Sequence, residues 1–357
     1  MRTGAIVGSL LILFGVPFSQ AIHASSASPP YITTAESIPA DEAASIDLVV
    51  QHVVSTIQTK YPVGVRPVHR DAHAKHHGCV KAEFEVTNQN LPPELRVGVF
   101  ARNQKFPAWI RFSNGSGKEN PDRSKDARGM AIKLMGVPGE KVLPDEKSEK
   151  TQDFLMIDHP VFFVDSAAHY VELEKGGVRF FLTHPRNAWV MAPLIFRPVP
   201  NPLSLRYWSE TPYALGPTAV KYSALPCNSN GLGTADHSHH DYLREAMTAT
   251  LASQSTCFQF AVQLQKDARK MPIENPTIEW NENDSPFIPV AKITVAAQSF
   301  DSAEQMDFCE NLSMTPWHSL PEHRPLGGIN RTRRAVYTTI SKLRHDMNNA
   351  PRREPEP

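Results

Sequence analysis

The hydrophobic positions of the chain follow two different periods. From Ile46 to Ile57 apolar residues recur at i, i+3, i+4 and i+7, which predicts an amphipathic helix. From Cys79 to Val86 apolar and charged residues alternate, which predicts a half-buried strand. Further strands are expected at 108–112, 129–134, 153–157, 258–264 and 290–295, and further helices at 167–175, 241–252 and 331–347. Two groups of strands with helices between and after them indicate an α+β fold.

Between residues 185 and 226 no period is visible and many of the chain's 31 prolines are concentrated, so long irregular coil over the surface is expected there. The length of 357 residues and the hydrophobic content of 41% allow a large core. We expect one domain at 45–348, after a flexible segment at 22–44 and before a disordered tail at 349–357.

The N-terminus has the features of a cleavable signal peptide. A short basic start, an apolar run from Ala5 to Phe18 and the small-residue exit Ser19-Gln20-Ala21 occur together. The apolar run is too short to span a bilayer, so residues 1–21 are expected to be removed. The mature protein is therefore expected to be secreted or periplasmic, with no stable membrane insertion.

Lys plus Arg and Asp plus Glu are equal at 37 each, which argues against a nucleic-acid partner and suits a small neutral substrate. A monomer or a homo-oligomer is expected. The four cysteines have no C-x-x-C spacing, so a zinc knuckle is not indicated. One or two disulfides and buried free thiols both remain compatible with the sequence.

Three segments carry the candidate chemistry. Residues 69–78 hold four histidines, residues 111–113 read Arg-Phe-Ser, and the C-terminal helix carries Arg333, Tyr337 and Arg344. Those three positions share one helix face, so two guanidinium groups are expected to bracket the Tyr337 phenol. Lowering the pKa of a phenol from about 10 to below 7 takes roughly 4 kcal/mol, which two such charges can supply. A phenolate is a hard ligand that suits ferric haem.

These segments, in order and from about residue 65 to 344, resemble the catalase core. The matching motifs are Arg70-x-x-His73-Ala74-Lys75, Arg111-Phe112-Ser113, Asp126-Ala127-Arg128-Gly129, Pro160-Val161-Phe162-Phe163 and Arg333 with Tyr337 and Arg344. The resemblance implies an antiparallel β-barrel with flanking helices, and haem b bound between the barrel and the helices.

The resemblance also implies roles. Tyr337 would be the axial ligand of the haem iron, with its pKa held down by Arg333 and Arg344. The other cofactor-binding residues would be Arg70, Arg111 and Tyr170. His73 would act as the distal base that takes the peroxide proton and returns it to the departing oxygen, and Ser113 would fix its ring.

Two positions depart from the catalase pattern. Ile157 aligns with the distal asparagine of catalases, with Asp158 next to it, and Ala72 stands where catalases carry valine and allene oxide synthases threonine. We therefore expect a secreted haem oxidoreductase that acts on hydrogen peroxide as a catalase or peroxidase. The alternatives are an organic or fatty-acid hydroperoxide isomerase or peroxidase of the allene-oxide-synthase type, and a non-catalytic haem-binding protein.

A third class, a histidine-rich zinc protein, would use other residues. His76 and His77 are expected to be ordinary surface histidines. The run from Asp236 to Asp241 holds ligand-type side chains without an established spacing, so only adventitious metal affinity is expected there.

Overall fold

The computed structural model describes residues 36–356, so the expected signal peptide at 1–21 and most of the segment at 22–44 lie outside the described residues. The strands are β1 (His76–Val86), β2 (Gln104–Asn114), β3 (Arg128–Met135), β4 (Thr151–Ile157), β5 (Tyr207–Trp208), β6 (Tyr213–Leu215), β7 (Thr218–Pro226), β8 (Thr256–Leu264) and β9 (Ile288–Val295). The α-helices are α1 (Glu42–Lys60), α2 (Ala167–Gly176), α3 (Val178–Thr183), α4 (Pro185–Phe196), α5 (Tyr242–Leu251), α6 (Ala303–Asn311) and α7 (Gly328–Asn348).

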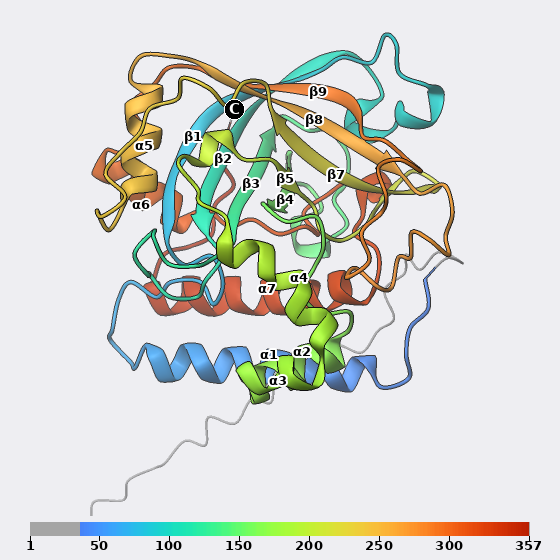
Figure 1. The fold of residues 1–357 in the computed structure, drawn as a ribbon, viewed down its shortest axis with the longest axis vertical. Helices are drawn as coiled ribbons and strands as arrows, with labels where there is room; N and C mark the ends of the chain where they lie inside the picture. The colour runs from blue at the N-terminus through green and yellow to red at the C-terminus, as the bar shows by residue number, and fades with distance from the viewer. Residues whose placement is uncertain (1–35, 357) are drawn as a thin grey trace, which may run out of the picture.

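The strands form a closed antiparallel β-barrel (Figure 1). Neighbours follow the order β5-β4-β3-β2-β1-β9-β8-β7, and β7 pairs back with β5 through Tyr207↔Ala224 and Trp208↔Ser223. The short β6 adds a hairpin partner to β7. Closure leaves the barrel strands without a long free edge. The expected α+β barrel with flanking helices is confirmed.

Aromatic rings fill the inside of the barrel. The ring of Phe154 lies 4.9 Å from that of Phe260 and 5.1 Å from that of Tyr222, and Phe84 lies 5.1 Å from Phe260. All four side chains are buried, and burial of each stabilises the fold by about 1.5–3 kcal/mol. The barrel interior is thus a packed core, and outward-facing residues of its strands are left to build a site.

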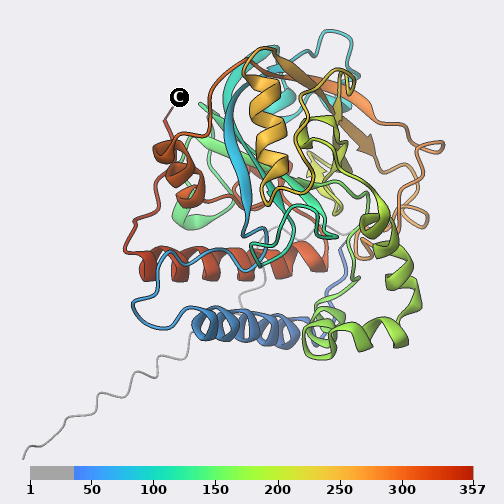
Figure 2. The same cartoon turned by 60° about the vertical axis from the view of Figure 1, so that its left-hand side comes forward.

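Two long helices cover one side of the barrel, and α7 lies between the barrel and α1 (Figures 1 and 2). The helices pack through Val49, Val53 and Ile57 of α1 against Val336 and Ile340 of α7. This packing confirms the apolar face predicted between residues 46 and 57. Among the described helices none is long and apolar enough to cross a membrane.

A buried ion-pair cluster fixes the start of α7. The guanidinium of Arg331 donates to Glu42 at 2.6 Å, to Glu36 at 2.9 Å and to Glu274 at 2.9 Å. Removing one partner from such a cluster leaves buried charge uncompensated, which costs about 3–5 kcal/mol. The cluster therefore sets the position of α7, and with it the positions of Arg333 and Tyr337, two and six residues further on.

The expectation of irregular coil at 185–226 is wrong. This stretch contains α4, β5, β6 and β7, and β7 is a barrel strand. The sequence pattern did not indicate this strand because both of its faces are buried. Lys221 and Ser223 are buried on one face, and Val220 and Tyr222 are buried on the other, so the alternation of polar and apolar residues does not mark a solvent-exposed face. Helices α3 and α6 were also not predicted.

Both cysteine pairs form disulfides, which resolves the two alternatives left by the sequence. Cys79 of β1 bonds to Cys309 of α6, and Cys227 bonds to Cys257 of β8. The first crosslink joins residues that are 230 positions apart. It holds the segment after α6 against the start of the barrel.

The C-terminal tail differs from the disorder expected at 349–357. Glu354 Oε2 lies 2.6 Å from the Nζ atom of Lys133, which also pairs with Asp153 at 2.7 Å. Arg352 donates to Glu354 at 2.6 Å. Lys133 and Asp153 are buried, so a second carboxylate stabilises the lysine charge and draws the tail onto the barrel.

Candidate active site

A cavity of about 470 Å³ lies between the outer face of β2–β4 and helix α7, a volume typical of small-molecule sites. It is lined by all the site residues predicted from the sequence, namely Arg70, His73, Arg111, Ser113, Tyr170, Arg333, Tyr337 and Arg344. Their side chains come from the turn before β1, from β2, from α2 and from α7. The structure thus brings them together, while their individual roles stay predictions.

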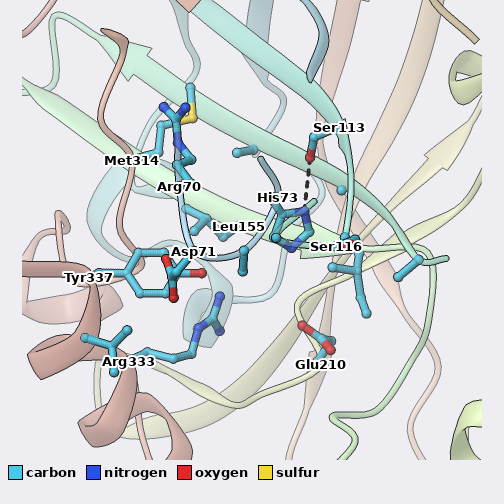
Figure 3. A pocket seen from close by; sticks show the side chains of 18 of the residues that line it. Arg70, Asp71, His73, Ser113, Ser116, Leu155, Glu210, Met314, Arg333 and Tyr337 are labelled. Atoms are coloured by element: carbon cyan, nitrogen blue, oxygen red, sulfur yellow. Dashed lines mark hydrogen bonds between the residues drawn. The ribbon is translucent and has the colours of Figure 1, made fainter. Parts of the chain in front are cut away.

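His73 is held by its backbone and by its ring. Its backbone lies in the left-handed region at φ 56°, and its N–H donates to the carbonyl of Gly115 at 2.9 Å. The ring Nδ1 lies 3.0 Å from Ser113 Oγ (Figure 3). A Cβ atom at Gly129 would lie 2.6 Å from that same nitrogen, so the ring rests directly on β3. A strained backbone of this kind is typical of a functional position.

The electrostatic surroundings keep the His73 imidazole neutral. Burial is the main cause and the charges of Arg111 and Arg333 add to it, so the pKa of His73 falls to about 3. If Nδ1–H donates to Ser113 Oγ, the other nitrogen, Nε2, is left as a free acceptor. At neutral pH the ring is therefore unprotonated, and Nε2 can accept a hydrogen bond from a ligand in the cavity.

Tyr337 and Arg333 enter the cavity from one face of α7 (Figure 3). The guanidinium of Arg333 lies 5.5 Å from the centre of the Tyr337 ring and donates to Thr211 Oγ1 at 3.2 Å. Burial lowers the pKa of Arg333, but the neighbouring Tyr337, Tyr213 and Glu210 outweigh it, and the pKa is raised. Arg333 is a permanent cation beside the phenol.

Arg344, the second guanidinium expected to bracket the phenol, bonds another group. It lies on the same wall of the cavity, and its guanidinium donates to the carbonyl of Glu310 at 2.8 Å. Seven residues of helix separate Arg344 from Tyr337 by about 10 Å along the axis. The guanidinium that packs over the Tyr337 ring is that of Arg333.

Arg344 belongs to a cationic cluster at one end of the cavity. Its members are Arg70, Arg111 and Arg344, which surround the single carboxylate of Glu310. Glu310 Oε1 lies 3.5 Å from Arg70 and 3.8 Å from Arg344. Burial lowers the pKa of Arg111 and the charge of Arg70 lowers it further, and its Nε atom has no hydrogen-bond partner. The three guanidinium groups of the cluster thus share the carboxylate of Glu310, and a further anion could bind among them.

Sequence reasoning missed two carboxylates, Glu210 in the cavity lining and Glu310 behind the arginines at its end. Glu310, which follows Cys309, is placed by the disulfide. Glu210 lies between β5 and β6 with φ 58°, and its side chain projects into the cavity (Figure 3). Burial raises the pKa of Glu210 to about 8. Neither residue belongs to a local pattern, so only a correct fold for 185–226 and the cysteine pairing could have indicated them.

The segment after β4 presents an apolar side chain to the cavity. Ile157 lines it, whereas Asp158 accepts from the backbone N–H of Arg128 at 2.7 Å and from the guanidinium of Arg197 at 2.6 Å. The carboxylate of Asp158 is thus used by protein groups. No amide or carboxylate from this segment lies beside His73 in the cavity lining.

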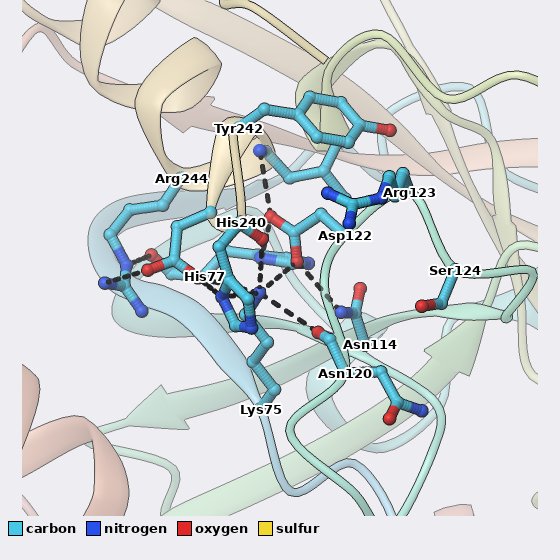
Figure 4. Close-up of polar contacts among 12 residues, drawn as sticks. Lys75, His77, Asn114, Asn120, Asp122, Arg123, Ser124, His240, Tyr242 and Arg244 are labelled. Carbon is cyan, nitrogen blue, oxygen red and sulfur yellow. Dashed lines mark hydrogen bonds and ion pairs between the residues drawn. The ribbon is translucent and has the colours of Figure 1, made fainter. Parts of the chain in front are cut away.

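The turn that carries His73 is secured from behind by Lys75 (Figure 4). Its ammonium group lies 2.7 Å from both Asp122 and Asp241, and Asp122 accepts from the first turn of α5 at Leu243 N. His77 is fully buried beside Asp122, so the expectation that it is a surface histidine is wrong, and His76 is also largely buried.

No protein-family model matches the chain, and no curated protein matches it. Solved structures do match. A fungal catalase has a TM-score of 0.60 at 17% identity, over 78% of this chain and 59% of its own. A bacterial catalase has 0.59 at 18% identity, over 99% of this chain and 70% of its own. Catalase A from Saccharomyces cerevisiae has 0.59 at 18% identity, over 86% of this chain and 64% of its own.

These comparisons establish the catalase fold for the chain. They do so at identities of 17–18%, and the chain spans less than two thirds of the fungal and yeast catalases that it matches. The fold is therefore shared, and the chemistry has to be argued from the cavity.

Proposed function

We propose that the chain is a haem-dependent oxidoreductase that acts on peroxides, with haem b in the cavity beside α7. The observation that carries this proposal is the conjunction of Tyr337, neutral His73 and the cationic cluster in one chamber of about 470 Å³. An apolar pocket with a few placed polar groups is the expected form of a cofactor site.

The charges of the cavity fit a dianionic cofactor. Arg70, Arg111 and Arg344 gather at one end of the cavity around the carboxylate of Glu310, so guanidinium groups outnumber carboxylates in this cluster. Haem carries two propionates, and planar guanidinium groups bind carboxylates in a bidentate manner. The unpartnered Nε of Arg111 is a donor that a propionate would satisfy. The residues present therefore fit haem.

On the α7 side, Tyr337 would be the protein ligand of the iron. Arg333 lies beside its ring and would supply a positive charge next to that ligand. When bound, haem would supply the ferric centre at which an oxygen–oxygen bond is cleaved. Tyr170 and Ile329 would contribute apolar surface to the pocket.

On the barrel side, His73 would move the proton. The neutral Nε2 atom takes the proton of the hydroperoxide and returns it to the departing oxygen, a shuttle worth about 10² to 10⁴ in rate. By accepting from Nδ1–H, Ser113 would hold the tautomer that leaves Nε2 free. The Lys75 contacts fix the turn, so the ring needs little reorganisation during the proton transfer.

A second substrate class is favoured by one observation. Ile157 lines the cavity and Asp158 is occupied by Arg128 and Arg197, so no polar side chain from this segment orients a small peroxide beside His73. Ala72 adds space next to the histidine. An organic hydroperoxide, which gains affinity from its apolar part, would suit this chamber better than hydrogen peroxide does.

The test is a haem assay followed by turnover of both substrates. Purified protein should give a pyridine haemochrome with one haem per chain, and Tyr337→Phe should change the ferric spectrum or lose haem. Tyr242→Phe, which removes a buried hydroxyl bonded to Val199 outside the cavity, is the matched control. Absence of haem from protein expressed with a haem supply would refute the proposal. Oxygen release from hydrogen peroxide, compared with conversion of a fatty-acid hydroperoxide, then decides the substrate class.

We also propose secretion. Support comes from the apolar N-terminal run and from two disulfides, which persist in oxidising compartments. Mass spectrometry of protein exported from an expression host should find an N-terminus at Ile22, and a retained Met1 would contradict the proposal.

A further inference from the structure

A second cluster of ligand-type side chains lies on α2 and at the start of α4. His169 and Glu172 are one turn apart on α2, and His184 precedes Pro185, the first residue of α4. Gly177, at φ 52°, turns the chain so that α3 brings His184 back to α2. One ligand atom from each of the three side chains lies within 4.8 Å of the others.

Both imidazoles are oriented through their Nδ1 atoms. His169 Nδ1 lies 2.5 Å from the carboxylate of Asp165, and His184 Nδ1 lies 3.1 Å from the carbonyl of Phe180. These contacts leave both Nε2 atoms available, and His184 Nε2 points to Glu172 at 3.7 Å. A carboxylate or carbonyl on the far nitrogen is the arrangement that fixes metal-binding histidines.

The rings are also held by packing. Phe180 stacks on His184 at 4.1 Å with an interplanar angle of 14°, and its edge meets His169 at 6.1 Å. The two imidazoles lie 4.7 Å apart, centre to centre. Two imidazolium groups at this separation would repel each other, whereas two neutral rings can share one cation.

We propose that His169, Glu172 and His184 bind a divalent transition metal of the zinc class. The ligands would be the two Nε2 atoms and a Glu172 carboxylate oxygen, with water in the fourth position. Two imidazoles with one carboxylate and no thiolate form a set that zinc accepts in tetrahedral geometry. The site is separate from the cavity and does not depend on the proposed haem.

The metal would join α2 to the segment that contains α3 and the start of α4. In that segment Leu182 and Trp189 are 82% and 79% exposed, whereas Phe180 is buried. A hydrogen bond from Asn187 to the carbonyl of Phe163, at 2.7 Å, is another attachment of α4. Because α2 also carries Tyr170 and Glu174 into the cavity, metal binding would stabilise one wall of the chamber.

The test is zinc titration of the full chain after chelator treatment and dialysis, followed by isothermal titration calorimetry with zinc chloride. We expect one zinc per chain, and at least about tenfold weaker binding in His184→Gln and in Glu172→Gln. Glu172 is a safe position because its side chain is 56% exposed. The matched control is His239→Gln, an exposed histidine that pairs with Glu245 at 2.7 Å and should leave the affinity unchanged.

A second readout is proteolysis of the 178–196 segment, which zinc should slow in wild type and leave unchanged in Glu172→Gln. Unchanged zinc affinity in His184→Gln and Glu172→Gln would overturn the proposal. An equal loss of affinity in His239→Gln would also overturn it, because binding would then be adventitious and spread over surface histidines.

Discussion

The guanidinium of Arg333 lies 5.5 Å from the centre of the Tyr337 ring, and one helix, α7, supplies both side chains. The spacing of cation and phenol is therefore set by helix geometry and does not depend on a loop. Arg331, two residues before Arg333 on α7, anchors that helix through its buried carboxylate partners.

Arg333→Gln tests the electrostatic part of this relationship. The amide can still reach Thr211, but the positive charge beside Tyr337 is lost. Each 1.36 kcal/mol of interaction energy lost beside the proposed iron ligand is a factor of ten, so peroxide turnover should fall at least about tenfold, with a changed ferric spectrum. Arg334→Gln, which removes a guanidinium 5.2 Å from the Trp317 ring, is the control. Equal turnover in the two variants would count against the role of Arg333.

Gly129→Ala tests the seating of His73. The added Cβ would lie 2.6 Å from His73 Nδ1 and 2.8 Å from Ser113 Oγ, so the ring must leave its position. We expect peroxide turnover to fall by about 10² or more, the worth of a placed acid–base group, while haem is retained. In Gly176→Ala the nearest atom lies at 3.9 Å, so this control should keep wild-type turnover. Full activity in Gly129→Ala would show that the ring position does not matter.

Glu210 should make the stability of the haem-free protein depend on pH. Burial raises its pKa from 4.5 to about 8, so the folded state holds a proton that the unfolded state releases. The contribution of Glu210 to the free energy of unfolding is therefore fully present below about pH 4.5. It declines as the pH rises towards 8, by at most about 1.4 kcal/mol per pH unit. Urea unfolding midpoints between pH 5 and 8 should fall less steeply in Glu210→Gln than in wild type.

Glu140→Gln is the control for that series. Its side chain is 71% exposed beside Lys147, so the pH slope should match wild type. Parallel slopes for Glu210→Gln and wild type would mean that Glu210 is ionised throughout this range in the folded protein.

The Cys79–Cys309 disulfide should affect both stability and the cationic cluster. Replacing both cysteines by alanine removes a crosslink across 230 residues, at a cost of about 2–5 kcal/mol, and releases Glu310 from its place between Arg70 and Arg344. We expect a lower urea midpoint and faster haem loss to an acceptor protein. The Cys227/Cys257 double alanine variant, whose crosslink spans 30 residues, should lose stability but keep haem. Identical rates of haem loss in the two variants would show that the position of Glu310 does not affect haem binding.

The sequence predicted most directly the elements that have one buried and one exposed face. In α1 and β1 one face is buried and the other is exposed, which produces the hydrophobic period from which both elements were predicted. In β7, burial on both faces removed the alternation, and the prolines before it suggested coil. The catalase fold itself was predicted from the order of the motifs along the chain. Hydrophobic periodicity indicates single helices and strands but not how they are arranged relative to one another.

The site divides in the same way. His73, Ser113 and Tyr337 lie at motif spacings along single segments, so their meeting in one cavity could be expected. Glu210 reaches the cavity only through the segment between β5 and β6, and Glu310 reaches the arginines that line it only because the Cys79–Cys309 disulfide joins α6 to β1. The direction of the Arg344 side chain depended on the carbonyl of Glu310, an acceptor that sequence alone does not place.

The pairing of β1 with β9 has a consequence for biosynthesis. During translation β1 can pair with β2 early, but its other edge stays unpaired until β9 has been synthesised. Cys79 likewise cannot form its disulfide until Cys309, 230 residues later, has been synthesised. Such late closure makes folding slow and leaves an exposed strand edge to aggregate. Recombinant yield should therefore depend on chaperones and disulfide isomerases more than on the stability of the finished protein.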